Sequence, residues 1–195
     1  MKPILLASAV LLAATHAAHA QILWNEFTQG DLSGDRFHPT PFNLAEGSNI
    51  LFGVMTGDDG TGTIDRDYFS ITIPQGHVLA RIDLLLYLSD DFAAFAGIQP
   101  GPIFPNDPDT VLPGDLLGWV VFGFDHEGQD LLAEMSLNGQ TFTPPLPAGT
   151  YTLWAQQLDS FTEWTPDFVV EPVPAPATLA LAALGVMAMR RRRST

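Results

Sequence analysis

A series of short apolar runs with the two-residue period of a β-strand, separated by glycine and proline, most constrains how this chain can fold. Along residues 68–73, apolar and polar side chains alternate, which is typical of a strand with one buried face. The run 116–124 is almost continuously apolar, as in the middle of a sheet. Further strands are predicted at 50–54, 78–88, 131–137, 150–158 and 168–170. Because no long segment of the body has a helical period, we predict a single antiparallel β-sandwich over residues 21–165.

Three segments of the body depart from this pattern. Residues 90–98 carry Phe92, Phe95 and Ala96 at helical spacing, which predicts a short helix. Residues 99–114 contain five prolines and are expected to form a long surface loop. Residues 166–176 are again rich in proline, and we expect an extended spacer there.

The amino-terminal segment has the three parts of a cleavable signal peptide. Lys2 provides the positive charge, 4–14 is apolar, and 18–20 reads Ala-His-Ala, a small-x-small cleavage site. We therefore predict a signal peptide over residues 1–20 and a mature chain that begins at Gln21. This implies that the Sec translocon and signal peptidase handle the chain.

The carboxyl-terminal segment has the pattern of a short membrane helix with a cytoplasmic stop. The apolar run 177–189 precedes a basic tail, 190–195, which begins with Arg190, Arg191, Arg192 and Arg193. As a helix this run is about 20 Å long, shorter than the ~30 Å hydrocarbon core. The run has no polar face, which disfavours an amphipathic or buried terminal helix. We predict a single transmembrane helix that is held in the inner membrane only transiently.

The whole tail resembles the PEP-CTERM sorting signal of Gram-negative bacteria, in which a short proline motif precedes a transmembrane helix and an arginine cluster. The motif here is Val173, Pro174, Ala175 and Pro176, with alanine where glutamate is usual. The resemblance implies recognition by an exosortase, cleavage near the prolines, and release to the cell surface or into an extracellular exopolysaccharide matrix.

Charge and composition exclude several classes of function. Between the two terminal segments lie all 22 acidic residues and only Arg36, Arg66 and Arg81 as cations, which gives a net charge of −19. Nucleic acids and anionic lipid surfaces require a basic footprint, so neither is an expected partner. The chain has no cysteine, which excludes disulfides, thiol nucleophiles and thiolate metal sites.

The densest acidic segment, residues 58–67, is a candidate calcium site. It places Asp58, Asp59, Asp65 and Asp67 around glycines, and calcium takes oxygen ligands in flexible geometry. The spacing matches neither the EF-hand loop nor the glycine-rich nonapeptide repeat. A solvated hairpin loop with a local ion pair to Arg66 is the alternative.

Two tryptophans are candidate contacts for glycans. Trp154 alternates with Leu153 in a predicted strand, which would place it on an exposed face, and Trp164 lies close to the end of the body. Packing of these two side chains against a loop or a partner is the alternative, and the one we favour. No serine lies in a Gly-x-Ser-x-Gly motif, and His126-Glu127 is not followed by the second histidine of a zinc protease. A glycosidase needs only two placed carboxylates, so that class stays open.

The strands also resemble the bacterial pre-peptidase C-terminal (PPC) domain. The similarity covers about residues 38–158 and rests on Asp67-Tyr68-Phe69 before Pro74-Gln75-Gly76, and on Pro147-Ala148-Gly149-Thr150-Tyr151 in the final hairpin. It implies a jelly-roll-like β-sandwich that serves as a non-catalytic accessory module. Some members of that family bind calcium, and Asp65 and Asp67 lie where acidic residues are frequent.

The leading hypothesis is therefore a non-catalytic exported protein that is sorted to the cell surface or exopolysaccharide matrix. A calcium-dependent glycan- or matrix-binding module is the first alternative, and a carboxylate-dependent glycosidase is the second.

Overall fold

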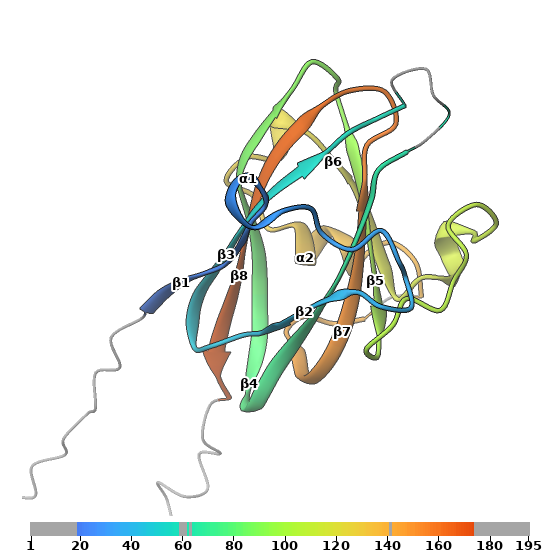
Figure 1. Ribbon diagram of the computed structural model, residues 1–195. Coiled ribbons are helices and arrows are strands. Elements are labelled where there is room, and N and C mark those ends of the chain that lie inside the picture. Colours follow the sequence, from blue (N-terminus) through green and yellow to red (C-terminus); the bar gives the residue numbers. More distant parts are fainter. Residues whose placement is uncertain (1–18, 59–61, 63, 141, 174–195) are drawn as a thin grey trace, which may run out of the picture.

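The computed structural model describes residues 19–58, 62, 64–140 and 142–173, and this part of the chain is all-β, as predicted. Figure 1 shows long, curved strands with only short helical turns between them. The strands are β1 (His19–Asn25), β2 (Thr40–Asn43), β3 (Gly47–Met55), β4 (Arg66–Ser89), β5 (Ala94–Pro100), β6 (Gly118–Phe122), β7 (Leu146–Gln156) and β8 (Thr162–Pro172). The helical elements are α1 (Glu26–Gln29), α2 (Leu131–Met135) and the two 3₁₀ turns η1 (Pro113–Asp115) and η2 (Phe124–His126).

The 24-residue strand β4 joins the two halves of the molecule. Its first part, 66–73, lies between β2 and β7. Its second part, 77–89, pairs with β8 and, at Val78 and Leu79 only, also with β7. Between them the register with β7 shifts, and Gly76 has a φ of +80°, which favours glycine. Beyond β7 follow β5 and β6, and beyond β8 follow β3 and β1. The β1–β3 and β2–β4 pairs are parallel, and the other pairs are antiparallel.

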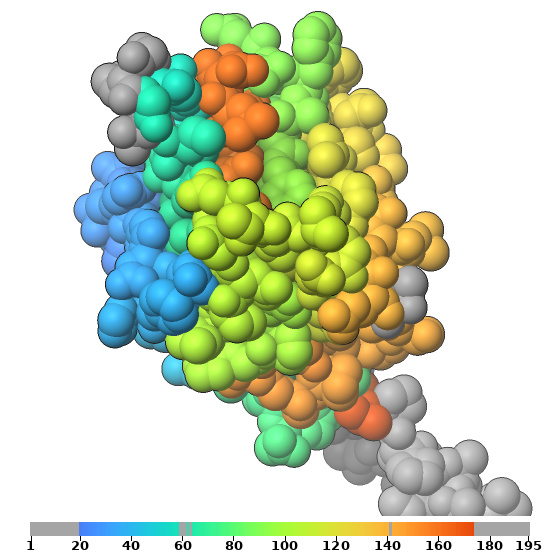
Figure 2. All heavy atoms as spheres, turned by 90° about the vertical axis from the view of Figure 1, so that its right-hand side faces the viewer, coloured from blue at the N-terminus to red at the C-terminus, as the bar shows by residue number. Residues whose placement is uncertain are grey.

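Two hydrophobic clusters lie on opposite faces of the first part of β4. The main core includes Phe69 together with residues of β3, β5, β7 and β8. The second cluster consists of Tyr68, Phe104, Leu116 and Trp154. The proline-rich segment 101–117 covers this second cluster, and Figure 2 shows the segment spread over this side of the molecule. It is held partly by the Arg36 guanidinium, which donates to the carbonyl oxygens of Phe104 (3.3 Å) and Pro105 (2.6 Å).

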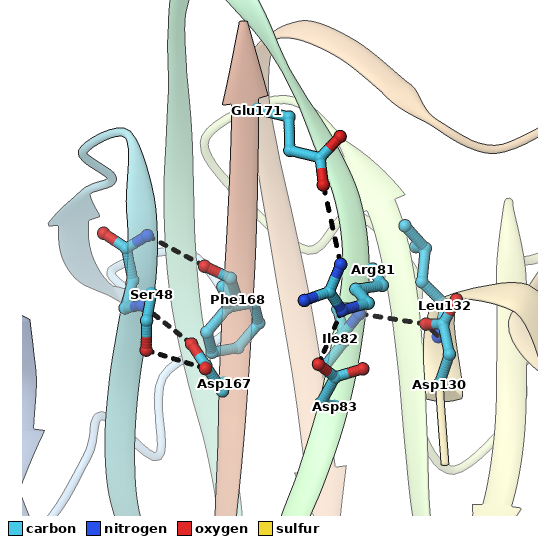
Figure 3. A network of polar contacts seen from close by, with 10 residues as sticks. Ser48, Arg81, Ile82, Asp83, Asp130, Leu132, Asp167, Phe168 and Glu171 are labelled. Atoms are coloured by element: carbon cyan, nitrogen blue, oxygen red, sulfur yellow. Dashed lines mark hydrogen bonds and ion pairs between the residues drawn. The ribbon is translucent and has the colours of Figure 1, made fainter. Parts of the chain in front are cut away.

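Buried and half-buried carboxylates connect neighbouring elements (Figure 3). Asp167 on β8 accepts hydrogen bonds from the Ser48 hydroxyl (2.7 Å) and the Asn49 amide (2.8 Å) on β3. Asp130 caps α2 by accepting from the Leu132 amide (2.9 Å), and the same oxygen accepts from the Ile82 amide of β4 (3.0 Å). Such contacts satisfy backbone donors that the strand ladders leave unpaired.

Two predicted elements have the wrong type. Residues 90–98 do not form a helix, because β5 pairs with both β6 and β7 and the tertiary pairing overrides the helical spacing. Residues 131–137 do not form a strand; α2 occupies this segment, with Asp130 as its amino-terminal cap. Leu131, Leu132 and Met135 of α2 are buried in the main core.

The predicted proline-rich spacer is also wrong for residues 166–172, which belong to β8, so that the domain extends beyond residue 165. Pro166 lies opposite Leu84, where the register between β4 and β8 shifts. Proline has no amide hydrogen to donate, and such an irregularity tolerates it.

The terminal predictions fall largely outside the described residues. Of the signal peptide, only His19 and Ala20 are described, and they pair with Gly47 and Ser48 of β3. The helix at 177–189 and the arginines 190–193 lie outside, as do residues 174–176 of the sorting motif. Val173 is exposed, and its amide donates to the Gly76 carbonyl (2.8 Å). Within the described part of the chain, no helix is long and apolar enough to cross a membrane.

The close approach of Trp164 to Gly53 gives a test of the packing between β3 and β8. These residues lie opposite each other, and a Cβ atom on Gly53 would overlap the Trp164 indole. Gly53→Ala should therefore lower the free energy of unfolding by about 1–3 kcal/mol. Urea unfolding followed by tryptophan fluorescence measures this change. Gly114→Ala is the control, because a Cβ there meets no atom within 4 Å. Equal losses in the two variants would contradict this packing.

Candidate functional site

Three carboxylates meet where β1 ends and β4 begins. Glu26 is the first residue of α1, Asp31 follows that helix, and Asp67 is the second residue of β4. One oxygen atom from each side chain lies within 4.8 Å of the other two. The tight turn of α1 sets this geometry: the Asn25 side chain caps it by accepting from the Phe27 amide (3.0 Å).

Glu26 is held rigidly by the backbone. One of its oxygens accepts a hydrogen bond from the Leu32 amide (2.6 Å), and the other accepts from the Val54 amide of β3. The Glu26 side chain thus attaches the α1 turn to β3. Burial, together with the neighbouring Asp31 carboxylate, raises the pKa of Glu26 to about 7 despite these two hydrogen bonds.

Asp67 is a fully buried carboxylate without a hydrogen-bond partner among the described residues. Its side chain is 0% exposed, and neither of its oxygens accepts a hydrogen bond. Burial, followed by the charges of Glu26, Asp65 and Asp31, raises its pKa well above the ordinary value. The adjacent Arg66 side chain instead contacts Asp109 (2.5 Å) and Gln156 (3.2 Å). An ionised carboxylate in such a place requires a cation to offset the cost of burial.

The cluster is connected to solvent by clefts. One cleft, of about 890 Å³, is lined by Asp31, Asp65, Thr56 and Phe161, among other residues. A smaller cleft of about 270 Å³ is lined by Glu26, Phe27, Asp31, Val54 and Phe161. Asp31 is exposed and lines both. Water or a solute can therefore approach the carboxylates from outside.

The described aspartates of the calcium site expected from sequence do not all lie together in the structure. Asp67 lies in the three-carboxylate cluster, and Asp65 lies near it, with one oxygen accepting from the Thr56 amide (3.1 Å) and hydroxyl (3.2 Å). Asp58 is exposed in the loop after β3, where it accepts from the Gly62 amide (2.7 Å). Asp59 lies outside the described residues.

Sequence reasoning missed Glu26 and Asp31. They lie 41 and 36 positions before Asp67, and no short motif joins the three. Only the docking of β1 and α1 on β3 brings these carboxylates together. A site built from residues this far apart in sequence cannot be predicted from local motifs.

The predicted glycan contacts through tryptophan are contradicted by burial. Trp154 is 4% exposed and lies among Tyr68, Phe95 and Phe104, with ring centroids 6.5, 4.8 and 5.7 Å away. The alternation that places it opposite Leu153 is correct, but the proline-rich segment covers that face.

Trp164 is 3% exposed and packs against Phe69 and Phe122, with ring centroids 6.3 and 5.5 Å away. The indole ring of Trp164 therefore has no face open to a sugar.

Comparisons with protein-family models, with curated proteins and with solved structures found no match.

The pKa shifts of this cluster predict how stability depends on pH when metal ions are absent. A carboxyl whose pKa is higher in the folded than in the unfolded state contributes stability below the unfolded pKa, and this is lost as pH rises through the folded pKa. For Glu26 the window runs from about 4.5 to about 7, and Asp67 acts in the same direction. The free energy of unfolding in EDTA should therefore fall as pH rises across this window.

Urea unfolding at a series of pH values measures this dependence. Asp67→Asn removes one of the shifted groups without removing a hydrogen bond, so it should flatten the profile and raise stability at pH 7. A wild-type protein that becomes more stable from pH 5 to pH 7 would contradict the electrostatics described here.

Proposed function

We propose that this chain is a non-catalytic exported protein that delivers an acidic, all-β domain to the cell surface or exopolysaccharide matrix of a Gram-negative bacterium. The Sec translocon exports the chain, and signal peptidase removes the amino-terminal segment. An exosortase then removes the carboxyl-terminal helix. The two terminal segments have the complementary patterns described above, and the domain between them carries a net charge of −19. Such a charge favours solubility in an exposed setting and disfavours binding to nucleic acid.

The observation that carries this proposal is the placement of the two ends of the domain. Gly47 of β3 is the pairing partner of both His19 at the start of β1 and Val170 near the end of β8. At ~4.8 Å between neighbouring strands, these two positions lie about 10 Å apart. Figure 1 shows β1 beginning and β8 ending at the same end of the molecule. A leader and a tail joined there leave the opposite end, with the carboxylate cluster, free of the membrane.

We further propose that the strands form a mainly antiparallel, jelly-roll-like β-sandwich of the PPC type, in which β1–β3 and β2–β4 are the parallel pairs. The described strands form one hydrogen-bonded sheet. β4 pairs with β2 and β7 in its first part and mainly with β8 in its second, which supports a sheet folded into two layers that share this strand. The Pro74-Gln75-Gly76 sequence of that resemblance lies at the register shift within β4, rather than at the end of a strand.

A carboxylate-dependent glycosidase is the second candidate, favoured by one specific pair. Glu26, with a pKa of about 7, lies beside the exposed Asp31, as an acid lies beside a nucleophile in retaining enzymes. Against this role, the Leu32 and Val54 amides donate to the two oxygens of Glu26 and favour its ionised form, whereas a general acid must carry a proton. We expect no release of reducing ends from a panel of polysaccharides. Hydrolysis that disappears in Glu26→Gln and Asp31→Asn would favour the enzyme.

The processing of the tail gives the direct test of the leading proposal. Mass spectrometry of the secreted protein should find a carboxyl terminus near Pro176 and no peptide that contains Arg190–Arg193. Pro174→Ala combined with Pro176→Ala should block cleavage and retain the chain in the inner membrane, whereas Val121→Ala, a change in an exposed residue of β6, should be processed normally. Secreted protein that still ends at Thr195 would contradict exosortase processing.

A further inference from the structure

We propose that Glu26, Asp31 and Asp67 bind a divalent cation of the calcium class. This inference goes beyond the proposed sorting and does not depend on it. It also differs from the calcium site expected from sequence, because two of its three ligands come from the first turn after β1 and not from the 58–67 loop.

The chemistry of the donors selects the class of ion. The cluster offers only carboxylate oxygens, with no histidine, and the chain has no cysteine. Hard cations such as calcium take oxygen ligands, whereas zinc and copper sites usually include imidazole or thiolate. Opposite oxygens around a calcium ion lie about 5 Å apart. Three carboxylate oxygens within 4.8 Å of one another can therefore contact one ion.

Asp67 provides independent evidence that the cluster holds a ligand. Both of its oxygens are buried, and neither has a partner among the described residues, yet Glu26 and Asp31 lie at contact distance for a shared ion. Buried polar atoms are nearly always satisfied in native proteins. A cation satisfies both oxygens at once and also offsets the repulsion among the three carboxylates.

The remaining coordination positions open toward solvent. Asp31 is exposed and lines the 890 Å³ cleft, so water molecules from the cleft can complete the six to eight ligands that calcium prefers. Glu26 is fixed by two backbone hydrogen bonds before any ion binds. Because a carboxylate oxygen can accept more than one contact, these bonds orient Glu26 as a ligand and still leave it able to bind.

Binding should also couple the start of the mature chain to the sheet. Glu26 lies five residues after Gln21, the predicted first residue of the mature protein, and Asp67 lies in the central strand β4. An ion between them crosslinks α1 to β4 in the folded state alone, so it should raise the melting temperature.

The test is a titration of the full chain, first stripped with EDTA, with calcium chloride, followed by thermal unfolding and isothermal calorimetry. We expect saturable binding of one ion and a rise in melting temperature of several degrees, with a smaller effect of magnesium at the same concentration. Asp67→Asn and Asp31→Asn should each weaken calcium binding at least tenfold. Asp67→Asn keeps the shape of the side chain and Asp31 is exposed, so both variants should remain folded in EDTA.

The matched control is the double variant Asp58→Asn and Asp59→Asn, which alters the loop site expected from sequence. It should bind calcium as the wild type does. The proposal is overturned if calcium neither binds nor stabilises the wild-type chain. It is equally overturned if the loop variant loses binding while Asp31→Asn and Asp67→Asn retain it. These outcomes leave the processing of the tail unaffected, so the two proposals fail independently.

Discussion

The pairing of β4 with two different sets of strands is the constraint on which the rest of the structure depends. Its first part belongs with β2 and β7, and its second part with β8, while the irregularity around Gly76 separates the two. Because the same strand serves both halves, the main core can include residues from β3, β5, β7 and β8 around Phe69. The opposite face of the first part of β4 carries a second apolar cluster. The proline-rich segment packs over Tyr68 and Trp154 on that face and shields them from solvent.

The carboxylate cluster follows from the same arrangement. The first residues of β4 lie at the end of the core, where Asp67 shares the buried face with Phe69 and where α1 folds back after β1. A hydrophobic residue at position 67 would be the simplest choice for stability. Placing an acid there, against Glu26 and Asp31, costs stability unless a proton or a cation neutralises it. A local cost of this kind is frequently found at functional sites.

Part of this architecture could be predicted from the sequence. The alternation at 68–73 and 78–88 correctly predicted strands, and both segments belong to β4. It did not predict that residues 67–71 are buried on both faces of that strand. The helical spacing of Phe92, Phe95 and Ala96 predicted a helix, and this prediction was wrong. The segment forms β5 instead, because it pairs with β6 and β7 on its two sides. Alternation also predicted the side of β7 on which Trp154 lies, but it carried no information about the segment that covers that side.

The sequence by itself determined that the chain is built of strands, that it is strongly acidic, and that it has the terminal patterns on which the sorting proposal rests. These properties depend on neighbouring residues or on composition, so they are visible along the chain. Only the tertiary structure decided which carboxylates meet. Glu26 and Asp67 are separated by 41 positions, and their approach depends on the parallel docking of β1 on β3 and on the Glu26 contact with Val54. Contacts between such distant positions arise from strand order and register, which short-range patterns do not specify.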